Sequence, residues 1–470
     1  MKKSRFLALP LLLVLLTFLL ALPASAAEDS TGSTGSTGSA ILDGMHVEAA
    51  AAILVDDDYG EILYQQNAHE KRYPASITKV MTAMLTIEAI DRGELSVDDM
   101  VTVEGDLHHG IGEGGSTADI KLGEQMTLKD LLACALIKSA NEACNALAVV
   151  VAGDVDSFVT LMNERAAELG MEDTHFANTH GYHDDDHYTT AYDIYLMCHE
   201  AMQHELFREL VSSKSYTIPA TNMSEQRNLH DTNALISTFN ITGYFYEYAT
   251  GIKTGSTPEA GYCLASSATK DGKNLIAVVL GAENPKREDG STNRLQFSES
   301  SRLLKWGFDN FSRQTILDGT VYPAEVKVTL SKEASSVAVH PDGVLEACLP
   351  NDLDPATFDL DWTLDADTVE APLEAGQKMG TITVSYNDVE YGTLDLVAIE
   401  SVERSELLYR LDRLEKFFDQ IWVKILLVAV IVVVAFLILR RLLFGRRRGR
   451  RYAYSGGRSR RYTGGRRRRR

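Results

Sequence analysis

The chain has 470 residues, of which 45% are hydrophobic and 24% charged, so it is long enough for two domains and is not wholly disordered. The formal net charge of −20 is unevenly distributed, because residues 440–470 hold 15 arginines and no acid, whereas residues 27–420 hold 27 basic and 66 acidic residues. Such an acidic body argues against nucleic-acid binding, and the two parts of the charge are expected to face different compartments.

Cysteine usage argues against a disulfide framework. Five cysteines are few for a chain of this length, and the odd number leaves at least one of them unpaired. Their spacing matches no zinc-binding pattern. We therefore expect small, buried, apolar side chains at Cys134, Cys144, Cys198, Cys263 and Cys348.

The N-terminus has the pattern of a secretory signal peptide over residues 1–26. A basic start is followed by an apolar stretch and then by the small residues Ala24-Ser25-Ala26, which form a cleavage signal. Export and cleavage before Ala27 are expected, with an uncleaved signal anchor as the alternative. Residues 27–45, rich in Ser, Thr and Gly, are expected to form a linker.

Residues 46–313 carry dense hydrophobic patterns that predict one folded domain. Apolar segments at 50–55 and 61–65 flank an Asp-rich turn and predict a hairpin, and residues 76–90 predict a helix. Thr127 with Asp130 predicts the start of a helix that ends near Ser139, Thr190 with Asp193 predicts another helix start, and Asp271-Gly272 predicts a second hairpin.

The pattern changes in residues 314–400, which predict a small all-β domain. Alternating strands are expected at 326–330, 336–340, 380–385 and 392–398. Residues 401–420 then predict an amphipathic helix that serves as a stalk or lies against the bilayer. Its apolar face is formed by Leu407, Leu411, Leu414 and Phe418, and continues to Ile421.

Residues 421–444 predict a single transmembrane helix. The run Ile421–Leu439 contains one charge, Lys424, and at 1.5 Å per residue spans about 28 Å. The Arg-rich tail, residues 445–470, is expected in the cytoplasm by the positive-inside rule, with the body outside the cell membrane. For this tail, contact with anionic lipid is favoured over RNA.

Ser76 and Lys79 stand three residues apart at a predicted helix start, so both side chains face the same way. This spacing suits a serine nucleophile and a lysine base, provided that burial or a nearby positive charge keeps the amine neutral. The helix start also supplies backbone N–H groups for an oxyanion. Ser267 and Lys270 repeat the spacing in a predicted strand, where they point to opposite faces and cannot cooperate.

Two further motifs follow in order. Ser139-Ala140-Asn141 lies between two apolar helical segments, where a serine can relay a proton and an asparagine can hold a substrate amide. Lys253 and Thr254 lie on a predicted strand and can bind a carboxylate. Gly255 would let a substrate backbone approach that strand closely.

S-x-x-K, S-x-N and K-T-G in this order resemble the signature of class A β-lactamases and penicillin-binding proteins. Within this group the chain is most similar to the D-alanyl-D-alanine carboxypeptidases of the penicillin-binding protein 5 type, peptidase family S11. The supporting segments are residues 73–79, 138–144, 179–181 with 187–191, and 251–257 with 260–262. The resemblance implies an α/β (α+β) penicillin-binding domain, with an antiparallel sheet flanked by helices, before the all-β domain and the membrane helix.

The resemblance also implies the reaction, which is removal of the terminal D-Ala from peptidoglycan stem pentapeptides, with β-lactams as inhibitors and no metal or organic cofactor. The implied roles are Ser76 as acylated nucleophile, Lys79 as its base, Ser139 as proton relay, Asn141 as amide ligand, Lys253 and Thr254 as carboxylate ligands, and the backbone N–H groups of Ser76 and Ser256 as oxyanion hole. Together with Gly255 these residues form the predicted site.

Three alternatives remain beside this interpretation. A membrane-anchored β-lactamase shares the motifs, but residues 174–178 lack the glutamate that class A enzymes place there. An inactive wall-binding scaffold is disfavoured by the intact motif residues. His183 and His187 flank three aspartates and suggest a metal site, although such an acidic run is more often a solvated turn. Some relatives have His where this chain has Ser256, which bears on substrate preference.

Overall fold

The computed structural model describes residues 45–444, so the predicted signal peptide, nearly all of the linker and the Arg-rich tail lie outside the described residues. The described chain forms two compact units. The first contains residues 45–318, 344–361 and 383–393, and the second contains residues 319–343, 362–382 and 394–444.

The first unit is built on a five-stranded antiparallel sheet with the order β2-β1-β9-β8-β7. Both predicted hairpins are confirmed, and the second turns at Asp271 and Gly272, whose φ angles of +53° and +79° suit a type I′ turn. The strands are β1 (Ala51–Asp56), β2 (Ile62–Gln66), β7 (Ala249–Thr257), β8 (Gly261–Lys270) and β9 (Lys273–Ala282).

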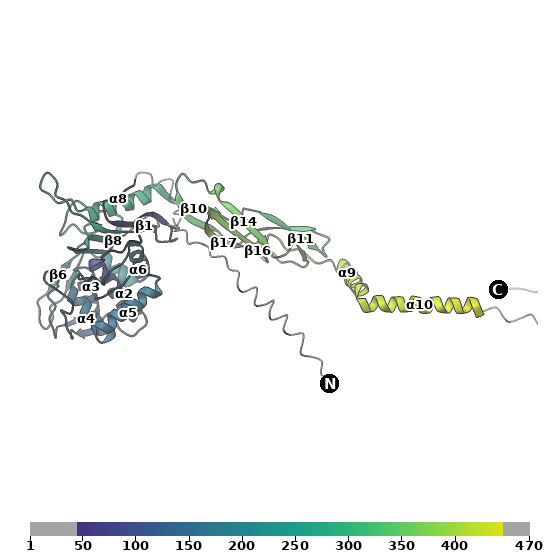
Figure 1. Cartoon of the computed structure of the whole chain (residues 1–470), viewed down its shortest axis with the longest axis horizontal. Helices are drawn as coiled ribbons and strands as arrows, with labels where there is room; N and C mark the ends of the chain where they lie inside the picture. Colours follow the sequence, from purple (N-terminus) through teal and green to yellow (C-terminus); the bar gives the residue numbers. More distant parts are fainter. Residues whose placement is uncertain (1–44, 445–470) are drawn as a thin grey trace, which may run out of the picture. The chain divides into compact units, whose positions relative to one another are not determined.

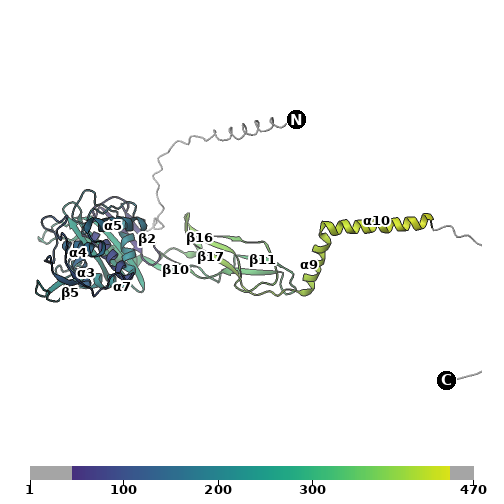
Figure 2. The ribbon, with the colours of Figure 1, turned by 90° about the horizontal axis from the view of Figure 1, so that it is seen from below.

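Helices cover both faces of this sheet (Figures 1 and 2). In β1, the side chains of Ala51, Ile53 and Val55 join the core beneath the larger helical layer, whereas Ala52 and Leu54 pack under helix α8. The larger layer contains α2 (Lys79–Asp91), α3 (Leu128–Leu136), α4 (Asn141–Ala152), α5 (Val155–Glu168), α6 (Ala191–Gln203) and α7 (Glu205–Ser212), and α8 spans Leu295–Asn310. Because both faces are covered, β1 is buried throughout.

The predicted helix starts are confirmed, with two adjustments. Thr127 and Asp130 form a reciprocal capping box, and the Thr190 side chain accepts from the backbone N–H of Asp193. The helix expected from Ser76 instead begins with a 3₁₀ turn, η1 (Ala75–Thr78), before α2. Helix α3 ends at Leu136, earlier than expected, because Ser139 adopts a left-handed φ of +65° that no helix continues through.

Shorter strand pairs complete the first unit. β3 (Met100–Thr102) pairs with β4 (Gln125–Thr127), β5 (Ser215–Ile218) with β6 (Arg227–His230), and β10 (Phe311–Leu317) with β13 (Leu345–Pro350). The five cysteines are all buried and unpaired, as the sequence predicts.

The C-terminal β region forms a six-stranded sheet with the order β14-β16-β17-β12-β11-β15. Buried and partly exposed side chains alternate along β12, where Val337, Val339 and Pro341 are buried. The strands are β11 (Ala324–Thr329), β12 (Ser336–Pro341), β14 (Asp359–Leu364), β15 (Thr368–Glu370), β16 (Lys378–Tyr386) and β17 (Val389–Ala398), with a 3₁₀ turn η2 at Pro355–Thr357. The four predicted strands are present, whereas β14 and β15 were not predicted.

Two helices follow the sheet. α9 (Glu406–Asp419) exposes the apolar side chains of its predicted stripe. α10 (Ile421–Phe444) has 24 residues, of which Val423 alone is buried, and is long and apolar enough to cross a membrane. Its bounds are those of the predicted span.

Candidate active site

Ser76 and Lys79 form the first contact of the site. Lys79 Nζ donates to Ser76 Oγ at 2.7 Å and to the carbonyl oxygen of His180 at 2.7 Å. The lysine side chain is fully buried, and burial, reinforced by the nearby charge of Lys253, lowers its pKa from 10.5 to about 7. A substantial fraction of Lys79 is therefore a neutral amine at neutral pH, as a base for Ser76 requires.

The segment 178–181 fixes this pair from the opposite side. Thr82 Oγ1 donates to the Thr179 carbonyl at 2.5 Å, and Thr179 Oγ1 donates to Asn145 Oδ1 at 2.6 Å. Gly181 has a φ of +78°, and a Cβ there would lie 1.8 Å from the Ala75 carbonyl oxygen. Only glycine allows this approach, which places the His180 carbonyl against Lys79. The sequence analysis did not predict that this segment positions Lys79.

Ser139 lies in the connection between α3 and α4, and Asn141 is the first residue of α4, so the motif stands at the junction of two helices, as predicted. Both side chains are nearly buried, and the backbone N–H of Asn141 donates to the Ser116 carbonyl at 2.9 Å. The left-handed backbone at Ser139 is a strained conformation of the kind found at functional sites. It ends α3 and turns the chain so that both side chains reach one pocket.

Glu142 holds the loop that faces these residues. Its Oε1 accepts from Thr117 Oγ1 at 2.7 Å, from the Ala118 backbone N–H at 2.7 Å, and from Ile120 N at 3.4 Å. The carboxylate is 3% exposed, so the charge is compensated by these donors rather than by water. The sequence contained no signal for this role, since the donors are about 25 residues away.

Strand β7 carries the third motif. Lys253 is 1% exposed, and its Nζ donates to the Thr254 carbonyl at 3.2 Å. Burial lowers the pKa of Lys253 to about 8, against the opposing influence of Asp231. A Cβ on Gly255 would lie 2.9 Å from the Pro74 carbonyl oxygen and 3.0 Å from Ser76 N. The glycine is therefore also needed for the close approach of the protein's own segment around Ser76, which sequence reasoning did not foresee. Approach of a substrate backbone to Gly255 stays a prediction.

One pocket of about 520 Å³ brings the three motifs together. The two buried lysines connect to it through Ser76 and Thr254, while the other six predicted residues line it directly. These six are Ser76, Ser139, Asn141, Thr254, Gly255 and Ser256. All eight predicted site residues therefore belong to one location.

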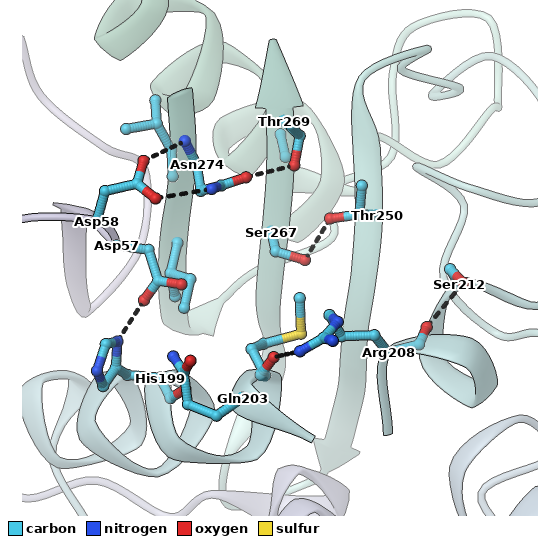
Figure 3. A pocket seen from close by; sticks show the side chains of 14 residues that line it. Asp57, Asp58, His199, Gln203, Arg208, Ser212, Thr250, Ser267, Thr269 and Asn274 are labelled. Carbon is cyan, nitrogen blue, oxygen red and sulfur yellow. Dashed lines mark hydrogen bonds and ion pairs between the residues drawn. The ribbon is translucent and has the colours of Figure 1, made fainter. Parts of the chain in front are cut away.

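A second groove, of about 710 Å³, lies at the opposite end of β7 and contains none of these residues (Figure 3). There Ser267 Oγ and Thr250 Oγ1 are 2.8 Å apart, and His199 Nδ1 is 2.7 Å from Asp57 Oδ1. Lys270 instead lies over the Tyr248 ring. The second S-x-x-K match is therefore not a catalytic pair.

His187, one of the two histidines of the possible metal site, has another role. His187 Nδ1 accepts from the Ala177 backbone N–H at 3.0 Å, so Nε2 carries the proton and donates to Thr78 Oγ1 at 2.8 Å. Burial lowers the pKa of His187 to about 3, which keeps the ring neutral. Both ring nitrogens are occupied, so His187 positions η1 rather than binding a metal.

Comparison with known proteins assigns the class. A family model described as D-alanyl-D-alanine carboxypeptidase, peptidase family S11, matches residues 37–284, and one described as the C-terminal domain of penicillin-binding protein 5 matches residues 319–404. The chain therefore belongs to the D-alanyl-D-alanine carboxypeptidase family, and is a serine-type hydrolase of the penicillin-binding protein 5 type.

Individual relatives agree. The chain is 34% identical over 390 residues to D-alanyl-D-alanine carboxypeptidase DacC of Escherichia coli, covering 80% of this chain and 87% of that protein. It is 30% identical over 368 residues to DacF of Bacillus subtilis, covering 78% and 89%. The crystal structure of penicillin binding protein 5 from Haemophilus influenzae superposes with a TM-score of 0.59 at 26% identity, covering 77% of this chain and 99% of that one.

Proposed function

We propose that this carboxypeptidase removes the terminal D-Ala of peptidoglycan stem peptides through an acyl-enzyme on Ser76. The observation that carries the proposal is the 2.7 Å contact between Ser76 Oγ and the amine of Lys79, which is fully buried. A buried amine with a pKa near 7 can accept the hydroxyl proton at neutral pH.

In the first step Ser76 Oγ attacks the carbonyl carbon of the penultimate D-Ala while its proton passes to Lys79 Nζ. The carbonyl π electrons move to oxygen, and the backbone N–H groups of Ser76 and Ser256 stabilise that oxyanion. When the tetrahedral intermediate collapses, the C–N bond breaks and the leaving amine takes a proton from Lys79 through Ser139. The products are free D-Ala and an ester on Ser76.

Water then attacks the ester carbonyl, giving up a proton to the same base, and the Ser76 oxygen leaves with that proton. In both steps Asn141 holds the substrate amide. In the first step Lys253 with Thr254 binds the terminal carboxylate of the peptide, which leaves with the released D-Ala. Each proton that leaves a nucleophile is returned to a leaving group, so the cycle needs no metal or organic cofactor.

Mass spectrometry of the purified chain after mixing with penicillin tests this proposal. A long-lived adduct on wild type, absent from Ser76→Ala, is expected, together with release of D-Ala from a pentapeptide. No adduct with rapid loss of the drug would indicate a β-lactamase, and no adduct with intact drug would indicate an inactive scaffold.

We also propose the domain arrangement and topology. A signal peptide (1–26) and linker (27–45) precede the catalytic domain (46–313), which is followed by a β domain (314–400) and a stalk (401–420). Residues 421–444 cross the membrane once, so that the catalytic domain is extracytoplasmic and the tail, 445–470, is cytoplasmic and binds anionic lipids. The apolar helix α10 supports the span.

Protease treatment of intact cells tests this topology. Digestion should remove the catalytic domain and leave the tail protected, and loss of the tail from intact cells would contradict the proposed orientation. For the tail itself, binding of its peptide to vesicles with and without anionic lipid is the measurement, and equal binding to both would contradict the lipid role.

A further inference from the structure

The loop after β6, residues 231–233, lies against strand β7 at the third motif. Asn233 Nδ2 donates to the Gly251 carbonyl at 3.0 Å, and Thr232 Oγ1 is 2.6 Å from Thr254 Oγ1. Thr232 also lines the active-site pocket. This loop, which none of the three motifs includes, therefore reaches the site.

The loop is held in a fixed conformation by its own polar groups. Asp231 Oδ1 accepts from the Asn233 backbone N–H at 2.5 Å, Asn233 Oδ1 accepts from Leu235 N at 3.0 Å, and Asn240 Nδ2 donates to the Asp231 carbonyl at 3.1 Å. Asp231 is 4% exposed and Asn233 is 1% exposed. Thr232 stands between these two anchored residues, so its hydroxyl is positioned before any substrate arrives.

The two hydroxyls act as one donor. Each threonine has one hydroxyl proton, and the bond between Thr232 and Thr254 uses one of the two, whichever residue donates. The other proton is left for a ligand in the pocket that both side chains line. A hydroxyl that already accepts a hydrogen bond is also a stronger donor.

The charge of Lys253, beside the hydroxyl pair of Thr232 and Thr254, indicates the chemical class of the ligand. Lys253 precedes Thr254 on the strand, and the carboxylate of Asp231 favours the ammonium form of that lysine by raising its pKa against the effect of burial. A hydroxyl donor next to an ammonium group suits a carboxylate, whose oxygens only accept.

We propose that Thr232 is a further substrate-binding residue, which pairs with Thr254 to bind the terminal carboxylate of the D-Ala-D-Ala peptide beside Lys253. This inference rests on the proposed function. It adds to the predicted site a residue that determines preference for peptides with a free carboxyl terminus.

The same strand provides a matched control. Thr250 lies at the other end of β7, where its Oγ1 is 2.8 Å from Ser267 Oγ in the remote groove (Figure 3). Thr250→Val removes an equivalent hydroxyl pair from the same strand without touching the active site. Thr232→Ser keeps the hydroxyl and serves as the conservative variant.

The experiment measures kcat/KM of the full-length chain on an acylated tripeptide ending in D-Ala-D-Ala and on the same peptide with a C-terminal amide. Thr232→Val should lower kcat/KM for the acid about 10-fold, mainly through KM, and change the amide little, since a hydrogen bond to a charged group is lost. Thr250→Val and Thr232→Ser should keep the wild-type preference. Thr232→Ala repeats the test if the valine variant does not fold.

A double variant separates direct binding from an effect through Thr254. If both hydroxyls serve the carboxylate, Thr232→Val with Thr254→Val loses more activity on the acid than Thr254→Val alone. An unchanged acid-to-amide ratio in Thr232→Val, or no added loss in the double variant, overturns the inference. If wild type turns over neither peptide, the proposed carboxypeptidase reaction itself is wrong, and the inference fails with it.

Discussion

Replacing Lys79 by methionine should stabilise the protein at acidic and neutral pH while abolishing acylation. The folded state holds this amine, fully buried, with a pKa of about 7, whereas the unfolded chain has the ordinary value of 10.5. Below pH 7 both states are protonated, and the difference in pKa corresponds to about 5 kcal/mol of lost stability. Methionine has a similar length and no charge to bury.

The difference in unfolding free energy between Lys79→Met and wild type depends on pH and reverses sign. Between pH 7 and 10.5 the unfolded state binds the proton and the folded state does not, so wild-type stability rises by about 1.4 kcal/mol per pH unit. Methionine loses the hydrogen bonds to Ser76 Oγ and the His180 carbonyl, a cost of about 2 kcal/mol. Lys79→Met should therefore be more stable by about 3 kcal/mol at pH 6, equal near pH 9, and less stable above it.

Thermal unfolding of both proteins in the same detergent, from pH 6 to 10, measures this difference. A gain of about 3 kcal/mol should raise Tm by about 6 °C or more at pH 6. Ser76→Ala is the matched control, because it is also inactive but keeps the buried lysine. Its stability should change with pH as that of wild type does, offset by about 1 kcal/mol for the lost hydrogen bond between Ser76 Oγ and Lys79. A Lys79→Met variant that is no more stable than wild type at pH 6 would refute the reasoning.

Three further predictions concern rate and stability. Acylation by fluorescent penicillin should rise with pH through about 7, as Lys79 becomes neutral, and fall above about 8, as Lys253 loses its charge; a flat profile from pH 6 to 9 would contradict this. Gly255→Ala should slow acylation about 100-fold with unchanged circular dichroism, because a Cβ would displace the nucleophile segment. Glu142→Ala should lower the unfolding free energy by about 2–4 kcal/mol, measured by urea denaturation, whereas exposed Glu164→Ala should change it little.

The sequence predicted the features that short-range chemistry determines. The turn at Asp271-Gly272 and the capping box at Thr127 depend on residues within four positions of one another, so their signals are complete in the sequence. The order of the three motifs predicted the family for a related reason, because each motif requires particular residue types at fixed spacing. The strands β14 and β15 lack such signals, because none of their residues is buried.

The residues that sequence reasoning missed act through contacts between distant segments. The His180 carbonyl meets Lys79 across 101 positions, Glu142 binds donors about 25 positions away, and Thr232 meets Thr254 across 22 positions. None belongs to a periodic pattern, and His180 acts through its backbone carbonyl, a group that every residue type has. Gly255 is a further example of a contact between distant segments. The need for glycine was predicted, but the approach of the segment around Ser76 was not.

The proposed mechanism needs two buried lysines in opposite charge states. Lys79 must be neutral to accept a proton, and Lys253 must be charged to bind a carboxylate, although both are buried and the charge of Lys253 acts on Lys79. Burial lowers both pKa values, so it cannot by itself distinguish them. The carboxylate of Asp231 acts on Lys253 and is not among the groups that act on Lys79. Lys79 is instead influenced by Lys253, which lowers its pKa, and less by Glu142, which raises it. The charged groups around the two amines therefore differ, which is how a pair of like groups can perform different tasks at one pH.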